Sequence, residues 1–384
     1  MINKKSSPDK KFCFSFFALL LLLSSFLASG VEPMNIPMEW NSLGFIKQPK
    51  TAGTSFSNWI LQHLARKLNL PPLRSSLNCT QHADQTNAFC ARPFCIPGMD
   101  PYMRSPAPRI IMDHAYFDED QLESVLVKPV LYFSLFRDPL QILRSMYNMA
   151  YFQWKSKKKD WVKAGDDSFC QSLTSDENSA EEWIRKCPAA VNSSGLILDY
   201  FTGFNRSKNA RQVLEKDNFL PLLYDKFDES LVLFAKVTGL PYTDLLYVPE
   251  LKYYTPTQIK AGRVKSDVNW VRDSVQLELH ANPYLKEEIS LFEVARMKFH
   301  QILSQIFVNA SELDAEVQKF TQLKKSFQAC IHHKIGIYDY HHYVSAVLKR
   351  KLPPLVGGDC GYVVPTLTMA VHLKQICGKG LEAN

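Results

Sequence analysis

Two stretches of the chain combine a short apolar run with a polar turn and then a helix-like pattern. The apolar runs are residues 43–46 and 130–136, and Ser134 is the one polar residue in the second. A nearly continuous apolar run of this length is typical of a parallel strand covered on both faces. The pattern therefore predicts two buried strands, each followed by a loop and a helix.

Helical periodicity supports both units. In the first, Ser55 can cap a helix whose apolar positions fall on one face: Phe56, Trp59, Ile60, Leu64 and Leu68. In the second, Asp138 can cap the helix and Pro139 can take its first position. Strands that alternate with helices predict an α/β fold in which a parallel sheet is flanked by helices. In such a fold the ligand binds at the carboxyl ends of the strands.

The remaining segments are less regular. A third short strand is predicted over residues 109–112, just before His114. Residues 219–224 and 229–239 have patterns that we interpret as mainly helical. Residues 70–108 are rich in Pro and Cys without a sustained period, which indicates a disulfide-tied excursion rather than a separate domain.

The amino-terminal end has the pattern of a membrane-targeting segment. Four lysines within the first 11 residues precede an apolar run, residues 12–28, that contains no charge. We expect an uncleaved signal anchor; a cleaved signal peptide is the alternative, because small residues at 28–30 would suit cleavage. The expected organisation is a cytoplasmic tail (1–11), a signal anchor (12–29), a short stem (30–42), a lumenal domain (43–330) and a carboxy-terminal extension (331–384).

Sequons and cysteines favour a lumenal location. Four Asn-x-Ser/Thr sequons follow the apolar run, at Asn78, Asn192, Asn205 and Asn309. Eight of the nine cysteines also follow it, so disulfides are expected, although the spacing does not decide their pairing. A zinc site at the cysteines of residues 79–95 is disfavoured, because their spacing is irregular and no nearby Cys pair completes four ligands.

The loop after the first strand suits an anionic ligand. The net charge of the chain is +7, and the expected lumenal compartment disfavours nucleic acid as the partner. The loop supplies a cation, three hydroxyl groups, a glycine and the free amides of a helix start, in the order Lys50, Thr51, Ala52, Gly53, Thr54 and Ser55. Such groups bind a multiply charged anion.

A nucleotide triphosphatase loop is an alternative for this segment. Gly44 and the pair Lys50-Thr51 match parts of the pattern G-x-x-x-x-G-K-[ST]. Pro49 stands in place of the second glycine, however, and proline has no amide proton to give to a phosphate. The loop would also consume residues 45–46, which belong to the predicted strand. We therefore reject this alternative.

A second anion site is predicted at the turn after the second strand. The guanidinium group of Arg137 can form a fork on a phosphate, and Ser145, eight residues later, can donate from the following helix. Two anion sites on two strand–helix units suit a ligand that carries two separate charged groups.

The two loops together resemble the cofactor signature of the sulfotransferases, in which a Lys-Thr loop takes the 5′-phosphosulfate of PAPS and an Arg–Ser pair takes the 3′-phosphate. Residues 45–55, 111–114 and 136–139 are similar to the membrane-bound carbohydrate sulfotransferases. Residues 224–233 and 244–247 are similar to the galactose 3-O-sulfotransferase family. The resemblance implies a Golgi membrane enzyme whose lumenal domain transfers a sulfuryl group from PAPS to a glycan or glycolipid, with no metal.

The resemblance also implies roles for individual residues. Lys50 would stabilise the charge that develops at the reacting group, and residues 51–55 would donate hydrogen bonds around it. Arg137 and Ser145 would hold the 3′-phosphate, and His114 would act as the base for the sugar hydroxyl group.

The acceptor stays open at this point. The chain has Asp113-His114 where the galactose enzymes tend to show paired histidines, and the uronyl 2-O-sulfotransferases would show His-x-His. The alternatives are therefore a uronyl 2-O-sulfotransferase that acts on glycosaminoglycan, and a lumenal glycan-binding protein without turnover.

Overall fold

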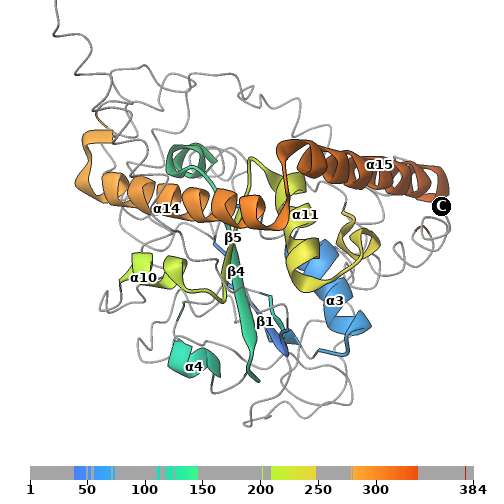
Figure 1. Cartoon of the computed structure of the whole chain (residues 1–384), viewed down its shortest axis with the longest axis horizontal. Coiled ribbons are helices and arrows are strands. Elements are labelled where there is room, and N and C mark those ends of the chain that lie inside the picture. The colour runs from blue at the N-terminus through green and yellow to red at the C-terminus, as the bar shows by residue number, and fades with distance from the viewer. Residues whose placement is uncertain are drawn as a thin grey trace, which may run out of the picture. The chain divides into compact units, whose positions relative to one another are not determined.

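Short apolar runs form the centre of the fold, a parallel sheet (Figure 1). The computed structural model describes residues 39–48, 51–52, 56–70, 72–73, 110–112, 117, 119–123, 126–145, 201, 209–247, 278, 280–335 and 377. All of them belong to one compact unit that spans residues 36–384.

Within the described residues, five strands form one sheet in the order β2-β3-β1-β4-β5, and every neighbouring pair is parallel. The strands are β1 (Ser42–Phe45), β2 (Pro72–Leu73), β3 (Ile110–Ile111), β4 (Val130–Phe136) and β5 (Phe219–Leu223). All residues of β1, β4 and β5 are buried, as is expected of strands covered on both faces. The predicted α/β class and the two predicted buried strands are confirmed.

The helical interpretation of residues 219–224 is wrong, because residues 219–223 form β5. Five apolar residues in a row carry no periodicity that distinguishes a strand from a buried helix segment. Pro221 is tolerated because β5 pairs only with β4 in the described sheet. The amide of Tyr224 donates to the carbonyl of Phe136 in β4. Successive residues of a strand point their amides to opposite sides, so position 221, three residues earlier, directs its nitrogen away from β4 and needs no ladder hydrogen bond.

The described helices lie around this sheet. They are η1 (Phe56–Leu61, a π-helix), α3 (Gln62–Lys67), α4 (Glu119–Glu123), a helical segment at 139–145, α10 (Ala210–Glu215), α11 (Phe227–Thr238), η6 (Tyr242–Leu245), α14 (Pro283–Ile306) and α15 (Ala310–Ile335). Both predicted loop–helix units are therefore present, and α11 confirms the helix expected over residues 229–239. None of the helices in the described residues is long and apolar enough to cross a membrane, and the apolar run at 12–28 lies outside those residues.

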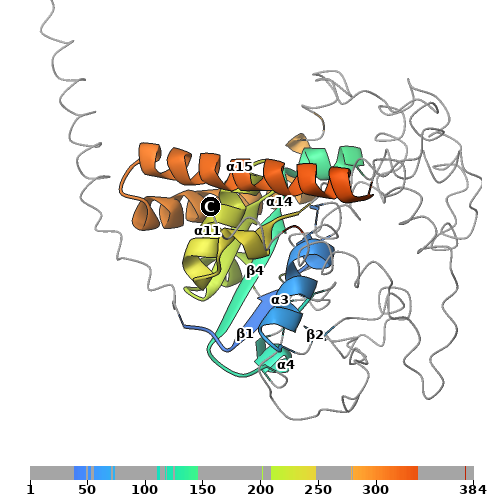
Figure 2. The ribbon, with the colours of Figure 1, turned by 90° about the vertical axis from the view of Figure 1, so that its right-hand side faces the viewer.

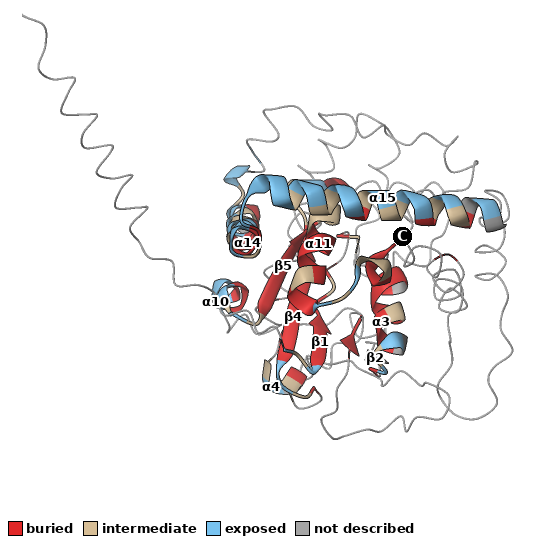
Figure 3. Ribbon diagram, turned by 45° about the vertical axis from the view of Figure 1, so that its right-hand side comes forward, coloured by how far each residue is buried: buried red, intermediate tan, exposed pale blue. Residues whose placement is uncertain are grey.

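Aromatic rings fill the space on both faces of β4. One cluster joins β1, β4, η1 and α11 through Phe45, Phe133, Phe56 and Phe234, with ring centroids 5.0–5.8 Å apart. The other, on the opposite face, contains Phe117, Tyr132, Phe136, Phe201 and Phe219. Helices α3 and α11 lie on the side of the first cluster (Figure 2), and strands β1, β3, β4 and β5 are buried throughout (Figure 3).

A buried carboxylate fixes the helix that follows the first loop. Asp244, which is 3% exposed, accepts hydrogen bonds from Lys67 Nζ at 2.7 and 2.9 Å and lies 2.9 Å from His63 Nε2. Burial raises the pKa of Asp244, but the hydrogen bonds from His63 and Lys67 outweigh it and lower the pKa below its ordinary value. The charged form of Asp244 therefore joins α3 to η6.

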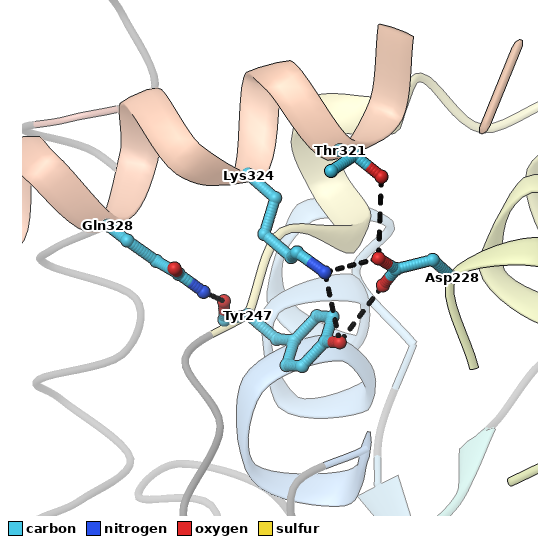
Figure 4. A network of polar contacts seen from close by, with 5 residues as sticks. All are labelled: Asp228, Tyr247, Thr321, Lys324 and Gln328. Carbon is cyan, nitrogen blue, oxygen red and sulfur yellow. Dashed lines mark hydrogen bonds and ion pairs between the residues drawn. The ribbon is translucent and has the colours of Figure 1, made fainter. Parts of the chain in front are cut away.

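The carboxy-terminal helix is attached to the sheet region by polar contacts. Asp228, at the start of α11, accepts hydrogen bonds from Tyr247 (3.0 Å) and from Lys324 of α15 (Figure 4). A disulfide joins Cys330 of α15 to Cys377, as expected for a chain with many cysteines. Helix α15 runs through residue 330, where we placed the end of the lumenal domain. The boundary itself stays a prediction.

Gly44 is required by packing rather than by a phosphate loop. It lies inside β1, opposite Tyr132 of β4, and a Cβ atom at this position would stand 2.4 Å from Cδ1 of the Tyr132 ring. This position is consistent with our rejection of the nucleotide triphosphatase loop, since the glycine belongs to the strand.

We expect Gly44→Ala to lower the free energy of unfolding by about 1–3 kcal/mol, because the added methyl group overpacks the sheet. Combining it with Tyr132→Leu should relieve part of this loss, which a double-mutant cycle in urea measures. Gly239→Ala is the control: its φ of 69° strains the backbone, but no atom lies within 4 Å of the added carbon. Additive effects of Gly44→Ala and Tyr132→Leu would show that the ring contact is not the reason for the glycine.

Candidate anion-binding site at the carboxyl ends of the strands

The two predicted anion loops leave the sheet at the same edge. Strands β1 and β4 are parallel neighbours, with Phe45 opposite Phe133. The loop that follows β1 and the turn that follows β4 therefore start side by side, at the carboxyl ends of both strands. This edge is where open α/β sheets bind their ligands.

The first loop is held by a series of hydrogen bonds. Thr51 is fully buried, and its hydroxyl group donates to the backbone carbonyl of Gln48 at 3.0 Å. Ala52 has a positive φ of 60°, which turns the chain, and its carbonyl accepts from the amide of Phe56 at 3.1 Å. The chain thus enters η1 directly from the loop. Lys50, Gly53, Thr54 and Ser55, which we predicted to bind the anion, lie outside the described residues.

A hydrogen bond links this loop region to the strand that precedes the predicted base. Ser57 of η1 donates to the carbonyl oxygen of Met112 at 2.6 Å, and both residues are buried. Met112 directly follows β3. His114 itself lies outside the described residues, but the chain reaches it from a point that is fixed beside η1.

The turn after β4 has the predicted capping geometry. Asp138 Oδ1 accepts a hydrogen bond from the amide of Gln141 at 3.0 Å, as an N-cap does, and residues 139–145 are helical. Arg137 leaves the end of β4 immediately before this cap. Ser145 lies in the helix and is half-buried.

Arg137 is held in a half-buried position by an aromatic ring. Its guanidinium carbon lies 4.3 Å from the ring centroid of Tyr224, the residue that follows β5. Burial lowers the pKa of Arg137 and the nearby Arg144 lowers it further, while Tyr224 and Asp138 act in the opposite direction. The position of Arg137 at the end of β4 gives this edge of the sheet a cation that an anion can approach.

Sequence reasoning missed two residues of this site. Arg144 is 8% exposed and directly precedes Ser145 in the helical segment, so its place beside the predicted serine could have identified it. Tyr224 could be found only after residues 219–223 were known to form a strand beside β4. Arg137, Arg144 and Ser145 thus belong to the second strand–helix unit, and Tyr224 comes from the end of the neighbouring strand β5.

One cavity among the described residues lies elsewhere. It has a volume of ≈ 480 Å³ and is lined by Glu119, Glu123, Lys128, Pro129, Val130 and Asn218. Val130 begins β4, so this cavity is at the amino ends of the strands, opposite the candidate site. Its two carboxylates do not suit a polyanion. No cluster of metal-ligating side chains occurs in the described part of the chain.

Comparisons with known proteins show the family to which the chain is similar. A family profile described as galactose-3-O-sulfotransferase matches residues 12–252. Human galactose-3-O-sulfotransferase 3 is 23% identical over 224 residues, which are 54% of this chain and 46% of the human protein. The mouse and bovine proteins of the same name are also 23% identical, over 46% and 47% of their lengths. The chain thus spans about half the length of the curated relatives it matches, and no solved structure matches it.

We expect Arg137→Ala to weaken the binding of adenosine 3′,5′-bisphosphate by about 10- to 100-fold, because a charged hydrogen-bond donor is lost from a half-buried position. Titration calorimetry measures this change. Arg211→Ala is the matched control, since Arg211 is an exposed arginine of α10 that pairs with Glu215. Equal affinity of the Arg137→Ala and Arg211→Ala variants for the bisphosphate would show that Arg137 does not bind it.

Proposed function

Because the chain belongs to the galactose-3-O-sulfotransferase family, we propose that it is a carbohydrate sulfotransferase that uses PAPS as donor and the 3-hydroxyl group of galactose, in a glycolipid or glycan, as acceptor. The observation that supports this proposal is that the two predicted anion loops leave neighbouring parallel strands at one sheet edge. PAPS has two anionic ends, the 3′-phosphate and the 5′-phosphosulfate, and each requires its own donors.

The proposed binding roles follow the two loops. Lys50 and residues 51–55 would surround the 5′-phosphosulfate, where the amides of the helix start and the hydroxyl groups of Thr54 and Ser55 would donate, while the hydroxyl group of Thr51 holds the loop through Gln48. Arg137, Arg144 and Ser145 would hold the 3′-phosphate. Recognition of the 3′-phosphate would separate PAPS from adenine nucleotides that lack it.

The proposed reaction is an in-line displacement at sulfur. The acceptor oxygen forms a bond to sulfur, the bond between sulfur and the bridging phosphate oxygen breaks, and adenosine 3′,5′-bisphosphate leaves. Lys50 would neutralise the negative charge that develops on the bridging oxygen. His114 would take the proton of the sugar hydroxyl group, because the pKa of imidazole lies near neutral pH.

The geometry around β3 supports the role of His114. The hydrogen bond from Ser57 fixes the carbonyl of Met112 beside η1, and η1 begins where the first loop ends. One residue, Asp113, stands between Met112 and His114, so the length of the chain keeps the Cα atom of His114 within about 7 Å of this fixed point.

We also propose that the domain lies in the Golgi lumen, held by a single amino-terminal anchor. Of the four sequons, Asn309 lies in the described part of the chain. It is exposed, and its amide oxygen accepts from the amide of Glu312 at 2.9 Å at the start of α15. Glycans attach to the amide nitrogen, so the cap and a glycan are compatible, which supports a lumenal location.

Donor selectivity tests the proposed nucleotide. Adenosine 3′,5′-bisphosphate should raise the midpoint of thermal unfolding, because a ligand that binds only the folded state stabilises it. ATP with magnesium, at the same concentration, should raise the midpoint less, because it has no 3′-phosphate for Arg137. Equal shifts with both nucleotides would contradict PAPS as the donor.

Two substitutions test the residues that we assign to the chemical step. His114→Ala should reduce turnover by about 10²–10⁴-fold, the usual effect of losing a general base, with unchanged affinity for the bisphosphate. Lys50→Ala should also act mainly on turnover rather than on the Michaelis constant for PAPS. Turnover of His114→Ala above about a tenth of the wild-type value would exclude His114 as the base.

A further inference from the structure

The first predicted anion loop, which follows β1, is attached to β4, the strand that leads into the second predicted anion site. Ser134 lies inside β4 and is fully buried, and its hydroxyl group donates to the carbonyl of Ile46 at 2.6 Å. The same hydroxyl oxygen accepts from Nε2 of Gln48 at 2.9 Å. The backbone carbonyl of Gln48 in turn accepts from Thr51. A continuous series of hydrogen bonds therefore runs from the interior of β4 to Thr51.

This series fixes the orientation of the Gln48 side chain. A serine hydroxyl group has one hydrogen, and the hydrogen of Ser134 is directed to Ile46. Gln48 must therefore present its amide nitrogen to Ser134. Its oxygen, Oε1, is the atom left over; it is buried and has no hydrogen-bond partner.

An unpartnered buried oxygen makes Gln48 a poor choice for stability alone. Gln48 is 1% exposed, and burial removes its oxygen from water without replacing the lost hydrogen bonds. A methionine of similar length would fill the space without this penalty. Gln48 differs from Gln62, whose buried Oε1 atom also has no hydrogen bond, because the amide nitrogen of Gln48 bonds the strand that leads to Arg137.

The position of Ser134 relates this hydrogen bond to both predicted sites. Ser134 stands three residues before Arg137, which directly follows β4, so β4 holds the first loop through Ser134 and leads into the predicted second site at its end. The distance between the two anion sites is thereby set from one rigid strand. A nucleotide with two phosphate groups gains affinity only when both sites are correctly spaced.

We propose that Gln48 and Ser134 are positioning residues that set the spacing between the two anion sites, and so select a nucleotide with both a 3′- and a 5′-anionic group. This inference rests on the proposed function. It assigns to Gln48 a role in donor recognition that it performs through the loop and not by contact with the reacting atoms.

The test compares two ligands on three variants. In the wild-type protein, adenosine 3′,5′-bisphosphate should bind more tightly than adenosine 3′-monophosphate, which uses only the second site. In Gln48→Met and Ser134→Ala this advantage should shrink about tenfold, the effect of losing one well-placed hydrogen bond, while the affinity for the monophosphate stays unchanged. Gln62→Met is the control, because Gln62 is equally buried but lies in α3.

Thermal unfolding without ligand separates positioning from packing. The midpoint of Gln48→Met should equal or exceed that of the wild-type protein, because the unpartnered oxygen is removed. A lower midpoint with an unchanged affinity ratio would show that Gln48 has only a structural role and would overturn the inference. If the wild-type protein fails to bind the bisphosphate at all, the proposed function fails instead, so the two failures are distinct.

Discussion

The parallel pairing of β1 with β4 is the constraint on which the rest of the structure depends. Its register places Phe45 opposite Phe133 and Gly44 opposite Tyr132. A slip of one residue would exchange the two faces of β4. Phe133 would leave the aromatic cluster, and Ser134 would no longer face the loop that it holds. The register is therefore specified by packing, and the position of the candidate site follows from it.

The site concentrates positive charge where water is partly excluded. Arg137 rests on the ring of Tyr224, and burial together with Arg144 lowers its pKa. Even so, an arginine remains charged at physiological pH. Attraction between such a charge and an anion is stronger here than at an exposed surface, because less solvent screens it. Arg137 thus suits an anionic ligand.

Much of the fold follows from the sequence, and the parts that do not have physical reasons. Residues 43–46 and 130–136 were identifiable as buried strands because each apolar run is followed by a loop and a periodic helix. Residues 219–223 were not, because five apolar residues fit a strand and a helix turn equally well until a neighbour is known. Without that strand, the position of Tyr224 beside Arg137 could not be predicted either. The link from Ser134 to Gln48 depends on side-chain contacts between segments 86 residues apart, which no local pattern contains.

The central claim, sulfuryl transfer to galactose, is tested most directly by the reaction itself. The purified protein would be incubated with PAPS carrying sulfur-35 in its sulfuryl group, together with a galactolipid, a galactose-ended oligosaccharide or a glycosaminoglycan. The account predicts labelled product from a galactose acceptor, with the sulfate on the 3-hydroxyl group. Transfer only to the 2-hydroxyl group of a uronic acid would contradict the galactose acceptor. Nucleotide binding with no transfer to any acceptor would contradict catalysis and indicate a glycan-binding protein.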